Sequence, residues 1–291
     1  MYSEVYSDLK IELTREDGAY FPLSNYPLGV ISIAGLEGSK VEIFAQKRAV
    51  GDGDIITGHR VASRNITVKL GLKDIGQYRP MRQILGAFLS SAFTYNVAFE
   101  YKGVRRIARG CLIKAMAMPT ENIHHTLFLT ITFFSPAGYL EGDGIEGADI
   151  NAVAPRFGFP LVSLVENGFI FSKREFRRAI TVDNTGHTPT YMNAVFTTTS
   201  TDGVLNPCLW LNNSLFVKVL HNLKKGEVLE IDTEQRTVRL NGKNALRLMS
   251  KSSQIGQMNL PVGLSTVGFT SETNDTYLSV NLTYGLRYDT I

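Results

Sequence analysis

The chain has 291 residues, of which 44% are hydrophobic and 20% are charged, and its formal net charge at pH 7 is +3. At roughly 100–200 residues per domain, this length predicts two domains, each large enough to bury a core. Such a small net charge gives no reason to expect a protein that binds nucleic acid or a membrane surface through clustered basic residues.

The sequence shows no targeting or membrane-spanning segment. The first residues, MYSEVYSDLKIEL, have no basic start and no continuous apolar run, so we expect no Sec signal peptide. The most apolar stretch, HTLFLTITFF at 125–134, is about half as long as a membrane span and contains threonines. The two cysteines, Cys111 and Cys208, are far apart, which favours reduced core thiols over a disulfide. We therefore expect a protein that folds in a cytosol and does not insert into a membrane.

Alternating apolar and polar residues predict β-strands through most of the first half. The runs 9–13, 41–45 and 66–72 alternate with a period of two residues. The sequence GDGD at 51–54 predicts a turn between the second and third runs. The segment 96–116 then predicts two long strands that are joined at Lys102 and Gly103.

One segment has helical periodicity. In YRPMRQILGAFLSS the apolar residues recur at positions i, i+3, i+4, i+7 and i+8, which places them on one helical face. Pro80 suits the first turn of a helix, where its missing N–H leaves no bond unmade. We predict one amphipathic helix over about 79–90 that covers a sheet, with an apolar face of Met81, Ile84, Leu85, Phe88 and Leu89.

The strand predicted at 126–134 has large side chains on both faces. One face carries only aliphatic and aromatic residues, and the other mixes threonine with phenylalanine. Such a strand is covered on both sides, either inside the domain, which we favour, or against a neighbouring subunit. In the second case the candidate oligomer contacts are Phe128, Thr130, Thr132 and Phe134.

The segment SPAGYLEGDGIEGADINAVAPR at 135–156 predicts the domain boundary, because it is rich in Gly, Asp, Ala and Pro and lacks periodicity. We place an N-terminal domain at 1–138, a linker at 139–156 and a C-terminal domain at 157–291. The acidic residues of the linker lack the spacing of an EF-hand, which favours a linker over a calcium site. These residues are Glu141, Asp143, Glu146 and Asp149.

The second half again predicts short strands separated by turns, a pattern that is typical of an antiparallel sandwich or jelly roll. Its best-patterned stretch is 223–244, a hairpin in which Leu229 faces Leu240 and Ile231 faces Val238. The turn NG at 241–242 places Lys243 opposite Leu240, so we expect a bulge in the strand that follows. The other predicted strands lie at 178–186, 193–200, 214–220 and 276–288.

The sequence contains no recognisable catalytic constellation. The five histidines lack the spacing of zinc ligands, and neither a G-x-S-x-G elbow nor a phosphate-binding loop occurs. Glu230 and Asp232, candidate carboxylates for a glycosidase, are two apart on one strand and cannot flank a sugar from opposite sides. We therefore expect no enzyme, and no catalytic, metal-binding or cofactor-binding residue.

Two further features have competing interpretations. The basic clusters at 102–109 and 173–178 alternate between strand faces, which favours solvated faces or subunit salt bridges over nucleic-acid binding. The only tryptophan, Trp210, lies between Leu209 and Leu211. It is the candidate glycan contact if the C-terminal domain is a lectin, although a tryptophan between leucines is more often a core residue.

The order of these features resembles the distal tail protein family of long-tailed bacteriophages and related proteins of phage-derived tail-like particles. In the first half the resemblance rests on GVISIAGLEGSKVEIFAQKRAVGDGDIITGHRVASRNITVKLGL at 29–72, the helix with MRQILGAFL, and ITFFSPAGYL. In the second half it rests on ITVDNTGHTPTYMNAVF, LKKGEVLEIDTEQRTVRLNGKNALRLMS and the closing LPVGLSTVGF with YLSVNLTYGLRY. It covers nearly the whole length.

This resemblance implies a mainly β protein of two domains. The N-terminal one is a β-rich, ring-forming domain with one packed α-helix, and the C-terminal one is an antiparallel jelly-roll or galectin-like β-sandwich. The implied role is structural: a homo-hexameric ring at the distal end of the tail tube, assembled in the cytoplasm of the host bacterium. The ring serves as a platform for baseplate or receptor-binding components in host attachment.

The partners implied are the tail tube protein, a tail-tip hub or tail-associated lysin, and receptor-binding proteins, while DNA passes without sequence-specific contact. We recognise neither an inserted carbohydrate-binding module nor an extended projecting arm. The alternative function is a lectin-like module for host adhesion.

Overall fold

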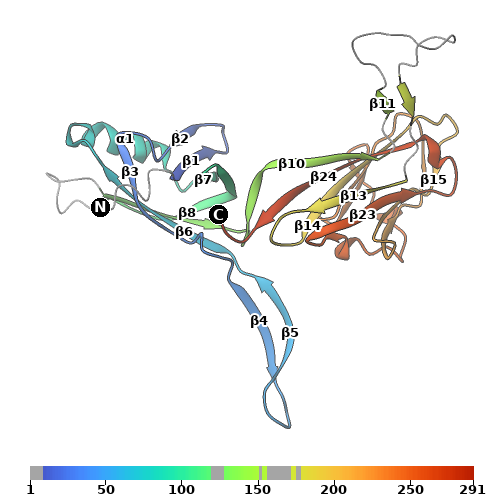
Figure 1. The fold of residues 1–291 in the computed structure, drawn as a ribbon, viewed down its shortest axis with the longest axis horizontal. Helices are drawn as coiled ribbons and strands as arrows, with labels where there is room; N and C mark the ends of the chain where they lie inside the picture. Colours follow the sequence, from blue (N-terminus) through green and yellow to red (C-terminus); the bar gives the residue numbers. More distant parts are fainter. Residues whose placement is uncertain (1–8, 119–127, 151–152, 156–171, 175–177) are drawn as a thin grey trace. The chain divides into compact units, whose positions relative to one another are not determined.

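The computed structural model describes residues 9–118, 128–150, 153–155, 172–174 and 178–291. This part of the chain is mainly β, which confirms the predicted fold class, and it contains one α-helix. It divides into two units: unit 1 comprises Met1–Asp143 with Arg287–Ile291, and unit 2 comprises Gly144–Leu286. Both divisions fall inside strands, β10 (Leu140–Ile150) and β24 (Leu278–Tyr288) (Figure 1). Most of the predicted linker at 139–156 is therefore regular strand.

Unit 1 contains two sheets that share the long strand β8 (Val104–Ala117). The first half of β8 pairs with β7, which pairs with β1, and the second half pairs with β9, which pairs with β6 and then β3. Strands β4 and β5 form a separate two-stranded hairpin between β3 and β6. The other strands of unit 1 are β1 (Leu9–Arg15), β2 (Tyr20–Pro22), β3 (Leu28–Ala34), β4 (Val41–Lys47), β5 (Asp54–Val61), β6 (Arg64–Leu72), β7 (Tyr95–Tyr101) and β9 (Phe128–Ser135).

The predicted helix is confirmed as α1 (Tyr78–Phe88), which follows the short 3-10 helix η1 (Ile75–Gln77). Met81, Leu85 and Leu89 are buried and belong to the same core as the inward residues of both sheets. Ile84 departs from the prediction, because 48% of its surface is exposed. The helix therefore contacts the core of unit 1 through a narrower stripe than the pattern predicted.

Unit 2 is a β-sandwich. One sheet has the order β13-β23-β16-β17, and the other contains β24-β14-β19-β20-β21, with β22 paired to β14. Inward residues from both sheets, among them Phe196 and Phe269, form one hydrophobic core. The remaining elements are β11 (Val153–Pro155), β12 (Ser172–Arg174), β13 (Ala179–Asn184), β14 (Thr190–Thr198), β15 (Val204–Leu205), β16 (Cys208–Leu211), β17 (Leu215–Lys218), β18 (Asn222–Leu223), β19 (Leu229–Asp232), β20 (Thr237–Leu240), β21 (Lys243–Asn244), β22 (Asn259–Leu260), β23 (Gly263–Thr270), η2 (Leu246–Leu248), η3 (Ile255–Gln257) and η4 (Asp275–Tyr277).

The hairpin predicted at 223–244 has the expected core pairs, Leu229 with Leu240 and Ile231 with Val238. The expected bulge is wrong, because Leu240 pairs directly with Lys243. Asn241 and Gly242 have φ angles of 50° and 76°. Two successive positive φ angles form a two-residue turn whose twist matches the flanking strands, so no shift of register is needed.

Candidate functional site

The hairpin β4–β5 is the most exposed regular element of unit 1. Every residue of β4 is exposed, and Figure 1 shows the hairpin extending away from the strands β3 and β6 that it connects. A two-stranded ribbon is marginally stable in water, and its apolar side chains gain nothing until another surface covers them. The exposed apolar residues are Val41, Ile43, Phe44, Val50, Ile55, Ile56 and Val61.

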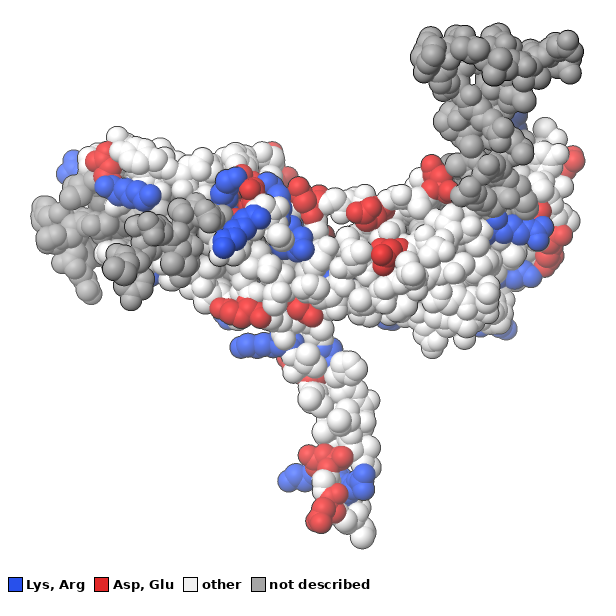
Figure 2. Space-filling view, viewed as in Figure 1, with Lys and Arg blue, Asp and Glu red and all other residues white. Residues whose placement is uncertain are grey.

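The hairpin corrects the expectation that the chain lacks an extended projecting arm. Its stem contains few charged side chains, whereas the tip carries charges of both signs (Figure 2). Arg60 and Glu42 form an ion pair of 2.6 Å across the ladder, close to the base. An arm with an apolar stem and a charged tip has the chemistry of a protein-binding element.

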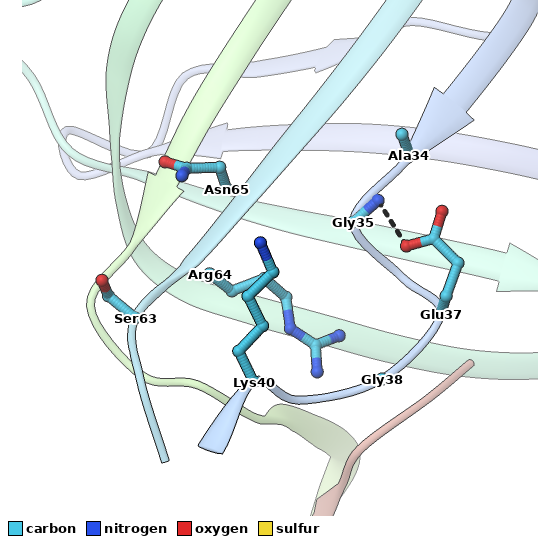
Figure 3. Close-up of a pocket in the computed structure, with 8 residues that line it drawn as sticks. All are labelled: Ala34, Gly35, Glu37, Gly38, Lys40, Ser63, Arg64 and Asn65. Carbon is cyan, nitrogen blue, oxygen red and sulfur yellow. Dashed lines mark hydrogen bonds between the residues drawn. The ribbon is translucent and has the colours of Figure 1, made fainter. Parts of the chain in front are cut away.

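At the base of the hairpin, the loop before β4 and the start of β6 enclose a polar pocket of about 260 Å³. Figure 3 shows Lys40 and Arg64 side by side in it, while Glu37 is turned toward the backbone of Gly35. The Gly35 N–H donates to Glu37 Oε2 at 2.7 Å. The other lining residues are Ala34, Gly38, Ser63 and Asn65.

Arg64 is the buried wall of this pocket, with 6% of its surface exposed. Its Nη2 donates to Ser39 Oγ at 2.9 Å and to the carbonyl oxygen of Asp289 at 2.6 Å. Its Nε and Nη1 are buried without a hydrogen-bond partner. Because burial disfavours the charged form, the pKa of Arg64 is lowered from its ordinary value.

The sheet β3-β6-β9-β8 has one face in the core and one open face. The open face carries all four candidate oligomer contacts: Phe128 is 44% exposed, and Thr130, Thr132 and Phe134 are half-buried. The expectation that the domain interior covers this face is therefore wrong. Thr132 Oγ1 lies 3.1 Å from Thr67 Oγ1 on β6, so the face is flat and hydroxyl-rich at its centre.

Trp210 lies on the outer face of the sheet β13-β23-β16-β17. Leu209 and Leu211 are fully buried, whereas Trp210 is half-buried, so the core interpretation of this tryptophan is wrong. Trp210 pairs with Phe216 on one side and Gly268 on the other. A Cβ atom at Gly268 would lie 2.3 Å from Trp210 Cζ2, so the indole ring occupies the space above this glycine.

The polar side chains that sequence reasoning considered for catalysis have structural partners. Glu230 Oε1 accepts a hydrogen bond from Asn193 at 3.1 Å, and Asp232 Oδ1 accepts from the backbone of the turn that follows. His221 lies 3.1 Å from Glu227, in a loop pair that is partly exposed. Among the described residues, no group of three or more His, Cys, Asp or Glu side chains is placed to hold a metal ion.

Two of the four basic residues in the cluster at 102–109, Arg105 and Arg109, form ion pairs within the chain. Arg105 pairs with Glu12 at 2.9 Å and with Asp143 at 3.2 Å, and Arg109 pairs with Glu141 at 2.5 Å. On the visible face of unit 1, Figure 2 shows acidic side chains beside the basic ones. These ion pairs lie within one chain, so the expected salt bridges between subunits stay a prediction. The second cluster, 173–178, lies mainly outside the described residues.

Sequence reasoning missed the arm β4–β5 and the pocket at its base. The available signal for the arm was the run from Val41 to Ala45, which places Ile43 and Phe44 next to each other and so puts apolar side chains on both faces. No sequence signal marked the burial of Arg64.

A family model matches a part of the sequence that lies mainly in unit 2, and solved structures match the fold of nearly the whole chain. Residues 185–288 match the family model described as the C-terminal domain of the siphovirus-type tail component. No curated protein sequence matches the chain. Every helix in the described part is too short or too polar to cross a lipid bilayer.

Two solved structures share the fold over almost the full length. The first is the crystal structure of SPP1 Dit, a hub of the adsorption apparatus in phages that infect Gram-positive bacteria, with 12% sequence identity and a TM-score of 0.66. That alignment covers 95% of this chain and 98% of the SPP1 protein. The second is the baseplate of phage P2 in its activated conformation with calcium, with 9% identity, a TM-score of 0.52, and 97% and 99% coverage. Residues 185–288 thus match the C-terminal domain of the siphovirus-type tail component, and nearly the whole chain shares the fold of these two phage tail structures.

Proposed function

We propose that the chain forms a homo-hexameric ring at the distal end of the tail tube and that the ring is a platform for baseplate or receptor-binding components. Unit 1 makes the ring and unit 2 offers the platform surface. The number six comes from the family resemblance, and the mode of contact comes from the geometry of unit 1.

The observation that carries this proposal is the exposed arm β4–β5. Ile43 and Ile56 are 63% and 67% exposed, which is unfavourable for a free arm in water. Covering apolar surface contributes about 25 cal/mol per Å², so burying a few such side chains on a neighbour supports a stable contact. The arm is an asymmetric feature, and an arm that binds a different surface of the next copy makes a head-to-tail contact, which forms a ring when the rotation between copies closes.

A second feature of unit 1 favours contact between copies. Among the described strands, β3 pairs only with β6, which leaves one edge of β3 available. An open strand edge presents unpaired backbone N–H and C=O groups to another chain. The open face with Phe128, Thr130, Thr132 and Phe134 belongs to the same sheet. We assign this sheet to the inner part of the ring, facing a sister copy or the channel.

Unit 2 supports the platform role through a rigid sandwich. Its partners are the tail tube protein, a tail-tip hub or tail-associated lysin, and receptor-binding proteins. Such an assembly acts through shape and symmetry, so we expect no turnover of a substrate, and DNA passes without sequence-specific contact. Assembly takes place in the host cytoplasm, and the ring remains in the virion tail.

The test is negative-stain imaging and light scattering of the full chain and two variants. The wild type is expected to form a sixfold ring with a central hole, alone or with the tail tube protein. Ile43→Glu with Ile56→Glu is expected to give folded monomers, because two buried charges oppose the contact. The matched control is Leu264→Glu, at a position 73% exposed on unit 2, which keeps the ring. A wild type that stays monomeric both alone and with the tail tube protein contradicts the proposal.

A second candidate function is carbohydrate binding by unit 2, favoured by the position of Trp210. A half-exposed aromatic ring on a sheet, with Phe216 directly opposite it on the next strand, can stack on a sugar ring. Trp210 is the only tryptophan, so its fluorescence reports on this surface alone. Titration with galactose, glucose and N-acetylglucosamine oligosaccharides is expected to shift the emission, and Phe216→Ala to weaken the shift. An unchanged spectrum with every sugar contradicts this candidate.

A further inference from the structure

The pocket at the base of the arm contains more unpaired positive than negative charge. Within the described residues, Lys40 is exposed and its ammonium group has no ion pair. Glu37 is the carboxylate that lines the same pocket, and the Gly35 N–H already donates to it at 2.7 Å. Ser63 and Asn65 add polar side chains to the rim. The pocket therefore offers an incoming anion a free ammonium group and neutral polar groups.

The buried side chain of Arg64 strengthens the preference of the pocket for an anion. Arg64 is 6% exposed, and two of its three nitrogens, Nε and Nη1, have no hydrogen-bond partner. Its Nη2 donates to a carbonyl and to the Ser39 hydroxyl, and the carboxylates of Asp289 and Glu37 act on the guanidinium charge electrostatically. The two nitrogens without a hydrogen-bond partner still favour a further anion nearby. Because Nε and Nη1 are enclosed, Arg64 acts on the pocket through its charge while Lys40 makes the direct contact.

The tip of the arm presents the complementary group. Asp52 lies in the turn GDGD between β4 and β5, is exposed, and has no ion pair or hydrogen bond with another described residue. Asp54 faces Lys47 across the ladder, so Asp52 is the freer carboxylate. The tip cannot reach its own base, because the 7 residues of β4 separate them by about 24 Å at about 3.4 Å per residue. Asp52 can therefore enter such a pocket only in another copy.

We propose that the pocket formed by Lys40 and Arg64 in one copy receives the carboxylate of Asp52 from the arm of the next copy. This inference rests on the proposed ring and adds its specific contact. Each subunit then has one donor end and one acceptor end on the same element, which gives every copy the same two neighbours. The apolar stem supplies contact area, and the ion pair fixes how far the arm advances along its neighbour.

The test is a charge exchange followed through assembly. Lys40→Glu alone and Asp52→Lys alone are each expected to raise the concentration needed for half assembly by at least about tenfold. The double variant restores opposite charges at every interface and is expected to assemble within about threefold of the wild type. Lys225→Glu, at an exposed lysine of unit 2, is the control for the change in net charge. The wild type and all four variants are compared by analytical ultracentrifugation at low and high salt.

The outcomes separate the contact from the ring. If Lys40→Glu assembles like the control while Ile43→Glu with Ile56→Glu does not, the ring stands and the proposed contact is wrong. If both single variants lose assembly and the double variant does not regain it, Asp52 is not the occupant and the proposal is also overturned. If the wild type itself never assembles, the proposed function fails first. Lys40 is exposed, so an unchanged thermal unfolding midpoint for Lys40→Glu shows that the variant is folded.

Discussion

Arg64 Nη2 donates a hydrogen bond of 2.6 Å to the carbonyl oxygen of Asp289, a residue 225 positions later in the sequence. Ser39 Oγ completes the cluster, since it lies 2.9 Å from Arg64 Nη2 and 2.8 Å from Asp289 Oδ1. Ser39 precedes the arm and Arg64 follows it. The last residues of the chain therefore hold both ends of the arm at one point of unit 1.

This cluster predicts that Arg64→Ala destabilises unit 1. The change removes two hydrogen bonds from a charged donor and leaves the carbonyl of Asp289 without it. Hydrogen bonds to charged groups contribute about 1.5–3 kcal/mol, so we expect the free energy of unfolding to fall by about 2–3 kcal/mol. Urea unfolding monitored by far-UV circular dichroism measures the difference.

Arg60→Ala is the matched control for that prediction. Arg60 belongs to the arm and pairs with Glu42 at 2.6 Å, but its side chain is 67% exposed. An exposed ion pair contributes about 0–1 kcal/mol, so this change is expected to lower stability by less than about 1 kcal/mol. Equal losses in the two variants would show that the buried cluster contributes no more than a surface pair.

The fold was predictable from sequence where local pattern and tertiary packing agree. The helix was found because Met81, Leu85 and Leu89 repeat with a helical period and contact the core. The pair Leu229 and Leu240 was found because alternation and a short loop fix the same register. Strand β10 was missed because its glycines give no alternation, and its conformation depends on pairing with the distant strands β8 and β24.

The candidate site was less predictable, because it depends on what lies outside a local stretch. The alternation that buries Leu209 and Leu211 also places Trp210 on the opposite face. The prediction followed instead the general observation that a tryptophan between two leucines is more often a core residue. For the arm, a strand with Ile43 and Phe44 has the composition of a covered strand, and sequence does not say which chain covers it. The role of Arg64 depends on Asp289, and one sequence does not reveal such a distant pairing.

A second prediction concerns the packing of Trp210. In Gly268→Ala, the new methyl group would lie 2.3 Å from Trp210 Cζ2 and 2.5 Å from the backbone oxygen of Arg178. The indole must move outward, and overpacking of this kind costs about 1–3 kcal/mol. We expect lower stability and a red-shifted emission of Trp210, measured by fluorescence during urea unfolding. An unchanged emission maximum would show that the ring does not occupy the space above Gly268.

A third prediction is that Gly86→Ala stabilises the chain. Gly86 lies in α1, is exposed, and has no atom within 4 Å of the position where a Cβ would be built. Alanine is favoured over glycine inside a helix by about 1 kcal/mol, so the free energy of unfolding should rise by up to about that amount. Gly86→Ala is expected to raise the free energy of unfolding and Gly268→Ala to lower it, because a Cβ atom has open space at Gly86 and meets Trp210 at Gly268. A loss of stability in Gly86→Ala would show that another surface contacts α1 there.

The fourth prediction concerns the two thiols and pH. Burial raises the pKa of Cys111 from 9.0 to about 12, so this thiol stays protonated and unreactive in the native protein. Burial also raises the pKa of the half-buried Cys208 thiol. We expect iodoacetamide at about pH 8 to modify Cys208 slowly and Cys111 only after unfolding in urea, as measured by mass spectrometry of peptides.

The raised pKa of Cys111 also predicts how the stability of the protein changes at alkaline pH. Because the folded pKa of Cys111 is raised, its contribution to stability is fully present below pH 9.0, the ordinary value, and is lost as pH rises toward about 12. Cys111→Ala removes this titration, so its stability should fall less steeply than that of the wild type above about pH 9. Cys208→Ala is the control, since its thiol is less buried and its removal should change the slope less. Parallel curves for the wild type and Cys111→Ala would mean that the thiol ionises equally easily in the folded and unfolded chains.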